Sequence, residues 1–365
     1  MSKAADLANL IGNINAGGGG VNRNVVINGA MNVAQRGTST TGLGADGTSY
    51  NTVDRFQFTV SGTAGRFTMS QDSSAPSGFS KSLKFDCTTA DTSIASGELL
   101  MLSQLIEGQN VQHFAKGTSD AKPFAVSFYV KGNASATYVA ELYDGDNNRC
   151  VSKTFSVTTD WTRIELSMGA DTTGAFDNDN AVSLYFNIWL HGGSNYTGGT
   201  LNTSWNAVTQ ANRAVGISSL FDSTDRTFFL TGVQVEAGQN ATEFEHEPIE
   251  RTLAKCKRYY HFYGGSSYAH FPSLGQGNSS SINWNHELPV EMRNTPTLAT
   301  SGDWRVQDTY GGSYYTLSSI SISSGDSTTK LVRGSATTSS AIGTDIGRIL
   351  AYGDSSARWA YSAEL

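Results

Sequence analysis

The stretch VSLYFNIWL (182–190) decides the fold class, because its residues alternate strictly between two kinds of side chain. One series is large and apolar and consists of Val182, Leu184, Phe186, Ile188 and Leu190. The other series consists of Ser183, Tyr185, Asn187 and Trp189. A repeat of two residues is the pattern of a β-strand, whose successive side chains point to opposite faces of the sheet. The stretch therefore predicts a strand with its apolar series in a core.

The same pattern recurs along the first two thirds of the chain. FAVSFYVKG (124–132) alternates in the same way, and FFL (228–230) and VQV (233–235) indicate a further strand. VVI (25–27) runs into an Asn-Gly pair, which is a turn signal. Between residues 24 and 247 short strands follow one another, separated by Gly, Asn and Asp, and no helical crossover interrupts them. This succession predicts an antiparallel β-sandwich.

Composition agrees with this prediction and excludes several other classes. The chain has 365 residues, of which 16% are charged and 10% are aromatic, and it contains 39 Gly. Its charged fraction lies well below the ~25% of average globular proteins, and its aromatic content excludes a disordered polyelectrolyte. Leu, Ala, Glu and Lys do not dominate, so a helical protein is disfavoured. The length predicts two domains.

Charge and cysteine content limit the partners and cofactors. With 25 Lys+Arg against 32 Asp+Glu there is no basic field for a phosphate backbone, so we expect no nucleic-acid partner. No apolar run of ~18 residues is present, and residues 1–13 do not resemble a secretion signal, so we expect no membrane insertion and assembly in a cytoplasm. The three cysteines at positions 87, 150 and 256 are predicted to be buried thiols, and no metal or cofactor is expected.

The first 20 residues form a separate segment. Leu7, Leu10, Ile11 and Ile14 are spaced as one face of a helix, and four consecutive glycines follow at 17–20. So short a helix cannot fold alone and has to pack on something. Two alternatives remain open: a docking or oligomerisation helix with a glycine hinge, or an end helix packed on its own domain.

A second helical stripe marks the domain boundary. Ile249, Leu253, Cys256 and Tyr260 recur at helical spacing after Pro248, which predicts a connecting helix over 249–264. Residues 265–365 are again strand-like and rich in Ser, Thr and Gly, which predicts a small C-terminal β-sandwich domain. The fold class is therefore all-β: a short N-terminal helix (1–20), a β-sandwich (21–248), the connecting helix and the C-terminal domain.

No catalytic or metal-binding motif is present. The sequence contains no G-x-S-x-G, Walker A, G-x-G-x-x-G or H-E-x-x-H pattern. Asp144-Gly145-Asp146 resembles the start of a calcium loop, but Phe155 stands where the bidentate Glu belongs, so a hairpin turn with exposed carboxylates is expected instead. A glycosidase needs only two suitably spaced carboxylates, and the 32 acidic residues leave that alternative open.

The candidate binding residues are aromatic and polar side chains on the outward faces of the predicted strands. They are Tyr129, Glu141, Tyr143, Tyr185, Asn187 and Trp189. Aromatic rings can stack on the apolar face of a sugar while amides and carboxylates bind its hydroxyls, and aromatic surface also suits protein interfaces. The alternatives are half-buried sheet residues or a subunit contact. A second aromatic-rich stretch, equally ambiguous, contains Trp284, Trp304, Tyr310, Tyr314 and Tyr315.

Several segments together resemble one known family. They are NVVINGAMNVAQRGTS (24–39), YNTVDRFQF (50–58), FAVSFYVKG (124–132), DWTRIEL (160–166), FFLTGVQVEAGQNATEFEHEP (228–248), ERTLAKCKRYYHFY (250–263), LPVEMRNTPTL (288–298) and ARWAYSAEL (357–365). Their order and spacing resemble bacteriophage tail fibre and receptor-binding proteins, in which a jelly roll like that of carbohydrate-binding modules precedes a small C-terminal domain.

That resemblance implies a non-enzymatic structural protein of the virion, in tail or head fibres. It implies a homotrimer that docks on other virion proteins through its N-terminus and attaches to a bacterial surface polysaccharide. The alternatives are a head fibre or decoration protein on the capsid and a capsule-degrading depolymerase. The family supplies no catalytic residues, and the motif residues, among them Asn28, Gly29, Asp54 and Arg55, are expected to be structural.

Overall fold

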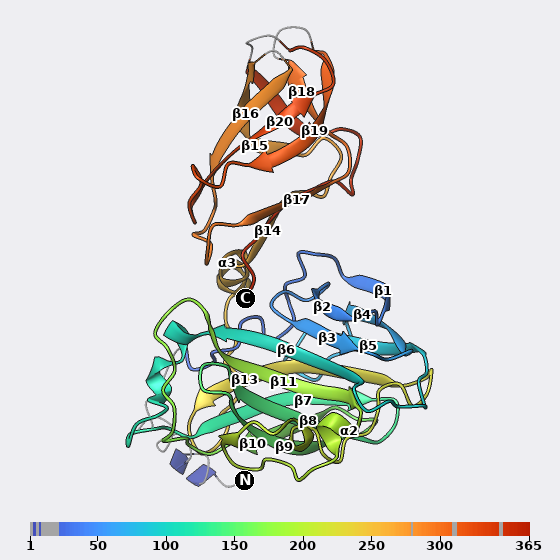
Figure 1. Ribbon diagram of the computed structural model, residues 1–365, viewed down its shortest axis with the longest axis vertical. Coiled ribbons are helices and arrows are strands. Elements are labelled where there is room, and N and C mark those ends of the chain that lie inside the picture. The colour runs from blue at the N-terminus through green and yellow to red at the C-terminus, as the bar shows by residue number, and fades with distance from the viewer. Residues whose placement is uncertain (1–2, 5–6, 9–21, 279, 309–311, 343–345) are drawn as a thin grey trace. The chain divides into compact units, whose positions relative to one another are not determined.

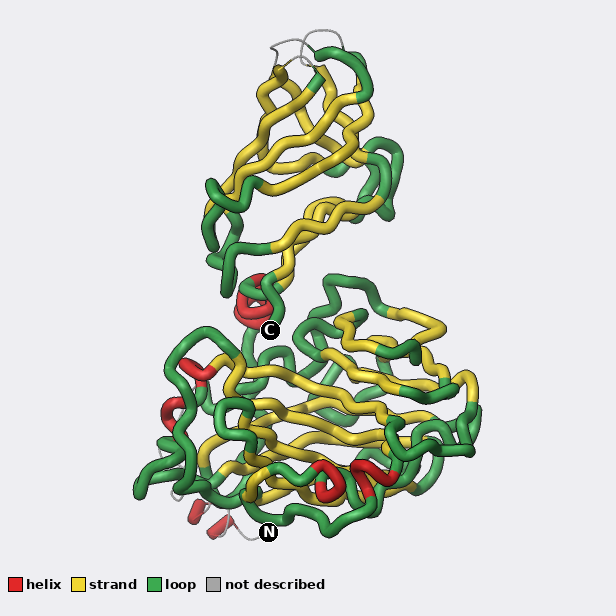
Figure 2. Tube along the Cα trace, in the orientation of Figure 1, coloured by secondary structure: helices red, strands yellow, loops and turns green. Residues whose placement is uncertain are grey.

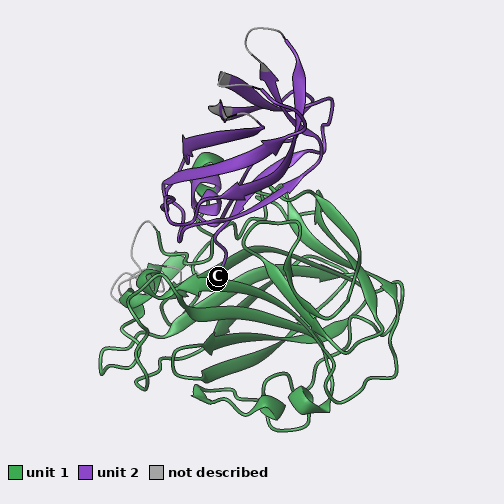
Figure 3. Ribbon diagram, turned by 45° about the horizontal axis from the view of Figure 1, so that its top comes forward, with its two compact units in different colours: residues 1–252, 365 green, residues 253–364 purple. Residues whose placement is uncertain are grey.

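The computed structural model describes residues 3–4, 7–8, 22–278, 280–308, 312–342 and 346–365 (Figure 1). The chain divides into two compact units, residues 1–252 with 365 and residues 253–364 (Figure 3). Strands dominate both units, and the helices are few and short (Figure 2). The all-β fold predicted from the sequence is confirmed.

The first unit is a jelly-roll sandwich of two antiparallel sheets. One sheet has six strands in the order β1 (Ser39–Leu43), β4 (Arg66–Asp72), β5 (Ser82–Thr89), β13 (Thr227–Ala237), β7 (Phe124–Gly132) and β10 (Thr162–Ser167). The other has seven strands in the order β12 (Asn206–Ala207), β9 (Arg149–Val157), β8 (Ala136–Asp144), β11 (Val182–Gly192), β6 (Leu99–Glu107), β3 (Gln57–Ser61) and β2 (Gly47–Tyr50). Figure 1 shows the long strands of this unit running side by side.

The core lies between the two sheets and follows the alternation of the sequence. In β11, Leu184, Phe186, Ile188 and Leu190 are all at most 1% exposed and belong to one buried apolar cluster. In β7, the apolar series beginning at Phe124 enters the same cluster. Burying large apolar side chains contributes about 1.5–3 kcal/mol each, so this cluster is the main stabilising element of the unit.

The opening motif of the sandwich is structural. The buried Asn28 side chain donates to the carbonyls of Val33 (2.9 Å) and Asp54 (3.0 Å), and its Oδ1 accepts from the Val33 amide (3.0 Å). Arg55, also buried, donates to the Leu105 carbonyl at 2.8 Å. A Cβ on Gly29 would lie 2.1 Å from the Val233 carbonyl oxygen, so only glycine fits there. These side chains hold the turn and its neighbouring strands.

The connecting helix is shorter than predicted. Helix α3 (Ile249–Lys257) ends before Tyr260, and residues 260–264 form strand β14 (Tyr260–Gly264). The aromatic run from Tyr259 to Tyr263 favours a strand, and β14 pairs with β22 (Arg358–Ser362) from end to end. Between residues 22 and 278, the other short helices are η2 (Gly108–Asn110), η3 (Gln112–Phe114), α2 (Ser194–Thr197) and η4 (Gln210–Asn212).

The second unit contains a small sheet and a closed barrel. The sheet has the order β14, β22, β17 (Thr297–Ser301). The barrel has the order β15 (His270–Asn278), β16 (Ser281–Glu287), β20 (Leu331–Thr338), β19 (Tyr314–Ile322), β18 (Trp304–Asp308) and β21 (Ile346–Ala351). The predicted two-sheet sandwich is therefore, in finer detail, a barrel. Trp284, Trp304 and Trp359 are at most 3% exposed and form its core, so two members of the second aromatic stretch are not surface residues.

Parts of the N-terminal prediction lie outside the described residues. Lys3, Ala4, Leu7 and Ala8 are helical, and Leu7 is 56% exposed. Leu10, Ile11 and Ile14 are not among the described residues, nor is Tyr310 of the second aromatic stretch. Across the described ranges, no helix is both long and apolar enough to cross a membrane. The three cysteines are buried.

Candidate functional site

Five of the six predicted binding residues lie together on the outer face of the seven-stranded sheet. In the pairing of β11 with β8, Tyr185 stands opposite Tyr143, and Asn187 stands opposite Glu141. Trp189 is two residues further along β11, on the same face. The sixth residue, Tyr129, belongs to β7 in the other sheet and cannot contribute to this site.

Glu141 is the centre of a buried hydrogen-bond network rather than an exposed sugar ligand. Its carboxylate accepts two bonds from Arg213, Nε to Oε1 at 2.8 Å and Nη2 to Oε2 at 2.7 Å. Oε2 also accepts from Asn187 Nδ2 (2.8 Å) and Trp189 Nε1 (3.2 Å), and Ser103 Oγ donates to Asn187 Oδ1 (2.7 Å). Glu141 and Asn187 are 0% and 1% exposed, so their predicted exposure was wrong.

Trp189 is also buried, at 0% exposed. Its ring packs in a second apolar cluster with Leu99, Val139 and Ala214, and it contacts the Tyr196 ring at a centroid distance of 5.2 Å. Tyr196 and Ala214 belong to the segment between β11 and β13. This segment covers part of the outer sheet face, so the side chain that points away from the main core is still excluded from solvent.

Tyr143 and Tyr185 remain half-buried and form the accessible part of the predicted site. Their rings meet edge to face with centroids 5.1 Å apart. The Arg213 guanidinium carbon lies 5.1 Å from the Tyr143 ring centroid and 4.9 Å from that of Trp189. Exposed amides adjoin them: Tyr143 Oη donates to Asn148 Oδ1 (3.3 Å), and Arg213 Nη1 donates to Gln210 Oε1 (3.2 Å). We call these residues, Tyr143, Asn148, Tyr185, Gln210 and Arg213, the tyrosine surface.

The charges at this surface are stable over the physiological pH range. Burial raises the pKa of Tyr143 and of Tyr185, so both hydroxyls stay protonated and can donate hydrogen bonds. Burial alone would lower the pKa of Arg213, but the Glu141 carboxylate outweighs this effect and leaves the pKa raised. The surface therefore offers two aromatic faces, a fixed cation and amide groups, which are the groups that a hydroxyl-rich ligand needs.

Tyr129 lies in a different environment. Its ring contacts Phe79 at a centroid distance of 5.3 Å on the outer side of the six-stranded sheet. Phe79 in turn contacts Phe244 and His246, so the 72–81 and 238–246 segments meet near this strand. Tyr129 is half-buried in this aromatic cluster. We therefore assign it to the covering of the sheet.

A hydrogen-bonded chain of Ser219, His191 and Glu98 was not visible in the sequence. His191 Nδ1 lies 2.8 Å from Ser219 Oγ, and Nε2 lies 3.0 Å from Glu98 Oε2. These residue types also make up nucleophilic triads. Here His191 is 0% exposed, and Ser219 Oγ accepts from the Phe221 amide (2.9 Å), so these hydrogen bonds connect the 217–221 segment to β11 and to Glu98, the residue before β6.

Asp144 is held by a buried ion pair and is not the exposed turn carboxylate that we expected. The Lys116 ammonium, 0% exposed, lies 2.5 Å from Asp144 Oδ2 and 3.1 Å from Asp171 Oδ2. It also donates to the carbonyls of Thr173 (2.9 Å) and Gly174 (2.8 Å). Four oxygens thus surround one cation. Among the described residues, no group of three or more His, Cys, Asp or Glu side chains is arranged to hold a metal ion.

Comparison with known proteins finds no matching family model and no matching curated protein. Solved structures that resemble the chain include the carbohydrate-binding module TmCBM61 in complex with β-1,4-galactotriose (TM-score 0.32, 10% identity, 59% of this chain and 99% of that one). Another is a family 11 carbohydrate-binding module from Clostridium thermocellum with a β-1,3-1,4-mixed-linked tetrasaccharide (0.28, 10%, 57% and 98%). A third is the enzymatically active domain of tailspike protein 4 from bacteriophage CBA120 (0.29, 12%, 59% and 21%). TM-scores this low carry no argument about function.

The sequence did not indicate the other members of the tyrosine surface. Gln210 and Arg213 come from the long segment between β11 and β13, and Asn148 comes from the β8–β9 turn. Arg213 is 72 residues from Glu141 along the chain, so only the folded structure brings the two together. The one local signal was the Asp-Gly hairpin sequence at 144–145, which located the turn.

Proposed function

We propose that this chain binds a bacterial surface glycan as a homotrimeric fibre protein of a bacteriophage virion. The observation that carries the glycan part is the tyrosine surface. Tyr143 and Tyr185 present two aromatic faces inclined at 61° to each other, and the Glu141–Arg213 network beneath them holds the surface rigid. A rigid surface loses little conformational entropy when a ligand binds. The virion part is supported by the order of the sequence segments, which resembles that of phage fibre proteins.

The mechanism is multivalent attachment. A half-exposed tyrosine pair offers a small contact area, so one site binds a sugar weakly. Several copies joined in one particle turn weak binding into strong adhesion without new contacts. The N-terminal segment, in which Leu7 is exposed, would dock on other virion proteins or join copies to one another.

The test of glycan binding is a screen of bacterial surface polysaccharides with the full-length protein. Stacking that buries about 50 Å² of apolar surface contributes about 1.3 kcal/mol, so the Tyr143→Ala/Tyr185→Ala double variant should bind at least about tenfold more weakly. Tyr129→Ala is the matched control, because it removes an aromatic from the other sheet. Binding that is equal in wild type and the double variant would refute the role of this surface.

Separate experiments test assembly and location. Light scattering at micromolar concentration should give the mass of a trimer, and the mass of a monomer would overturn the proposed trimer. Deleting residues 1–20 should abolish incorporation into particles while both units stay folded. Images of particles should show the protein at the tail. A location on the capsid would favour the head fibre or decoration alternative, and release of reducing ends from host capsule would favour the depolymerase.

A further inference from the structure

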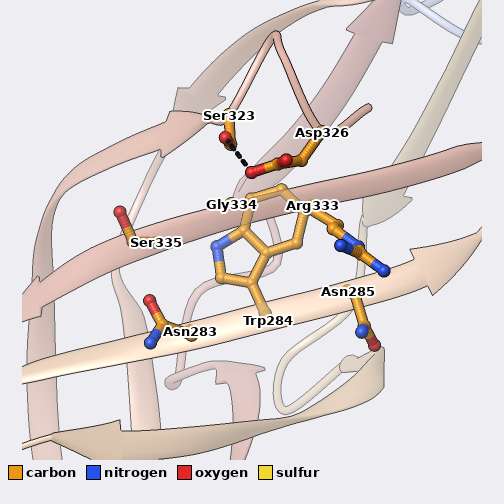
Figure 4. A pocket seen from close by; sticks show the side chains of 8 residues that line it. All are labelled: Asn283, Trp284, Asn285, Ser323, Asp326, Arg333, Gly334 and Ser335. Carbon is orange, nitrogen blue, oxygen red and sulfur yellow. Dashed lines mark hydrogen bonds between the residues drawn. The ribbon is translucent and has the colours of Figure 1, made fainter. Parts of the chain in front are cut away.

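A polar groove lies on the outside of the barrel in the second unit, at a distance along the chain from the tyrosine surface. The cavity has a volume of about 550 Å³. Residues of β16, of β20 and of the loop that joins β19 to β20 line it, and its polar side chains are those of Asn283, Asn285, Ser323, Asp326, Arg333 and Ser335 (Figure 4). Trp284 and Gly334 complete the lining. We call this set the barrel groove. Pockets of ~300–1,000 Å³ are typical of small-molecule sites, so the groove is large enough for a sugar unit.

Strand register places these side chains together. In the pairing of β16 with β20, Asn283 stands opposite Ser335 and Asn285 opposite Arg333. Between them, Trp284 stands opposite Gly334 and is only 3% exposed. Because side chains alternate across a strand, the amides and Arg333 share the outer face while the Trp284 ring packs inside the barrel.

The floor of the groove is rigid. The Trp284 ring contacts Phe271 and Trp359 at centroid distances of 5.5 and 5.1 Å. A Cβ on Gly334 would lie 2.2 Å from Trp284 Cζ2, so the backbone of β20 rests directly against the indole. The groove residues are therefore supported by the packed core of the unit.

The wall of the groove is a fixed loop. Ser323 Oγ donates to Asp326 Oδ2 at 2.9 Å, and the Ser323 amide donates to the Arg333 carbonyl at 2.9 Å. Ser327 Oγ donates to the Ser323 carbonyl at 2.8 Å and accepts from the Arg333 amide at 3.0 Å. These bonds hold Ser323 and Asp326 over the end of β20, close to Arg333.

The two charged side chains of the groove differ in whether they have a hydrogen-bond partner. Asp326 has a hydrogen-bond donor in Ser323, whereas the exposed Arg333 guanidinium has no hydrogen bond or ion pair in the part of the chain that the structure describes. The exposed Asn283 amide likewise lacks a partner within the described residues. A guanidinium presents several donors in a planar fork that matches a carboxylate. Amide, hydroxyl and carboxylate groups match the hydroxyls of a sugar.

We infer that the barrel groove binds an acidic saccharide, with the sugar carboxylate on Arg333 and its hydroxyls on Asn283, Ser335 and Asp326. The assignment to the saccharide class rests on the proposed function, but the residues are independent of the tyrosine surface. A chain with both sites would bind sugar residues through each of its two units.

The test titrates the full-length protein with glucuronate, with glucose as the neutral probe and acetate as the carboxylate without hydroxyls, and follows binding by NMR. Glucuronate should bind at least tenfold more tightly than either glucose or acetate. Arg333→Gln should weaken glucuronate binding by about tenfold to a hundredfold, because a charge-assisted hydrogen-bond pair is lost. Arg348→Gln is the matched control, since Arg348 is exposed on β21 of the same barrel and does not line the groove.

The outcomes separate this site from the proposed function. Loss of glucuronate binding in Arg333→Gln, with binding retained in Arg348→Gln and in Tyr143→Ala/Tyr185→Ala, supports the barrel groove. Equal binding of acetate and glucuronate, no binding of glucuronate by wild type, or full binding by Arg333→Gln would overturn it. Polysaccharide binding that depends only on the tyrosine surface would leave the proposed function standing and refute the groove.

Discussion

Mild acid should destabilise the second unit, because it contains two buried histidines without hydrogen-bond partners in the described part of the chain. His261 in β14 and His286 in β16 are each 7% exposed, and within the described residues neither ring nitrogen of either side chain has a hydrogen-bond partner. The Tyr263 ring lies between them, with centroid distances of 4.6 Å to His261 and 5.3 Å to His286. The Phe271 and Tyr361 rings also face His286.

These surroundings favour the neutral imidazole. Burial lowers the pKa of His286 from the ordinary 6.5 to about 4. Burial also lowers the pKa of His261 to about 4, with smaller contributions from the charges of Lys257 and His286. A lowered folded-state pKa means that the unfolded chain binds protons more readily than the folded chain. Stability is therefore complete above pH 6.5 and is lost as the pH falls from 6.5 towards 4.

The magnitude follows from the two pKa values. At pH 5, a group with a pKa of 6.5 when unfolded and about 4 when folded loses about 2 kcal/mol of stabilisation, and two such groups lose about 4 kcal/mol. That loss is a large part of the ~5–15 kcal/mol of a typical domain. Hydrogen exchange measured by mass spectrometry should therefore show faster opening of residues 253–364 at pH 5 than at pH 7.5, after correction for the intrinsic exchange rate.

The matched comparison is His261→Phe/His286→Phe, which keeps the aromatic packing and removes both titrating groups. This variant should lose most of the difference between pH 5 and pH 7.5, whereas His246→Phe, at an exposed site in the first unit, should retain it. An opening free energy of the second unit that is the same at both pH values in wild type would refute the argument. So would an unchanged pH dependence in the double variant.

Three further predictions concern the first unit. Glu141→Gln should cost about 3 kcal/mol in urea unfolding, because it leaves the largely buried guanidinium of Arg213 without a countercharge; a loss below 1 kcal/mol would contradict this. Lys116→Ala should lower the melting temperature and leave four oxygens around an empty position. Millimolar CaCl₂ should therefore raise the melting temperature of the variant but not of wild type, and no calcium effect would contradict this arrangement of the four oxygens. Gly29→Ala should cost at least about 2 kcal/mol in the same unfolding assay, because its Cβ would meet the Val233 carbonyl oxygen at 2.1 Å; wild-type stability would show that the turn can shift.

The fold could be predicted from the sequence wherever the alternation of apolar and polar side chains along a strand determines it. The alternation in β11 requires only that one face meets a core, and every inward position from Leu184 to Leu190 is buried as expected. The end of α3 could not be predicted from helical spacing alone, because Tyr260 fits both a helical stripe and a strand. The pairing of β14 with β22 decides in favour of the strand, and that partner lies about 100 residues further along the chain.

The candidate binding face was harder to predict, because a strand pattern shows which side chains point away from the core but not what covers them. Trp189 and Asn187 point outward and are nevertheless buried, since the segment between β11 and β13 packs over them. Trp284 shows the opposite case: it alternates with two exposed amides and belongs to the core, as the strand pattern alone predicts. In the first unit, a covering segment with no local signal determines which side chains meet the solvent.

The covering segment also gives the tyrosine surface its chemistry. Arg213 reaches Tyr143 only because the buried carboxylate of Glu141 holds its guanidinium in place. Under the proposed function, losing Glu141 would therefore release a cation next to the glycan and weaken binding, although Glu141 itself is fully buried. In that case Glu141 would position a binding group instead of contacting the sugar. In Glu141→Asp the shorter carboxylate cannot make both bonds to Arg213 from the same backbone position. This substitution should reduce the free energy of glycan binding by more than it lowers the free energy of unfolding.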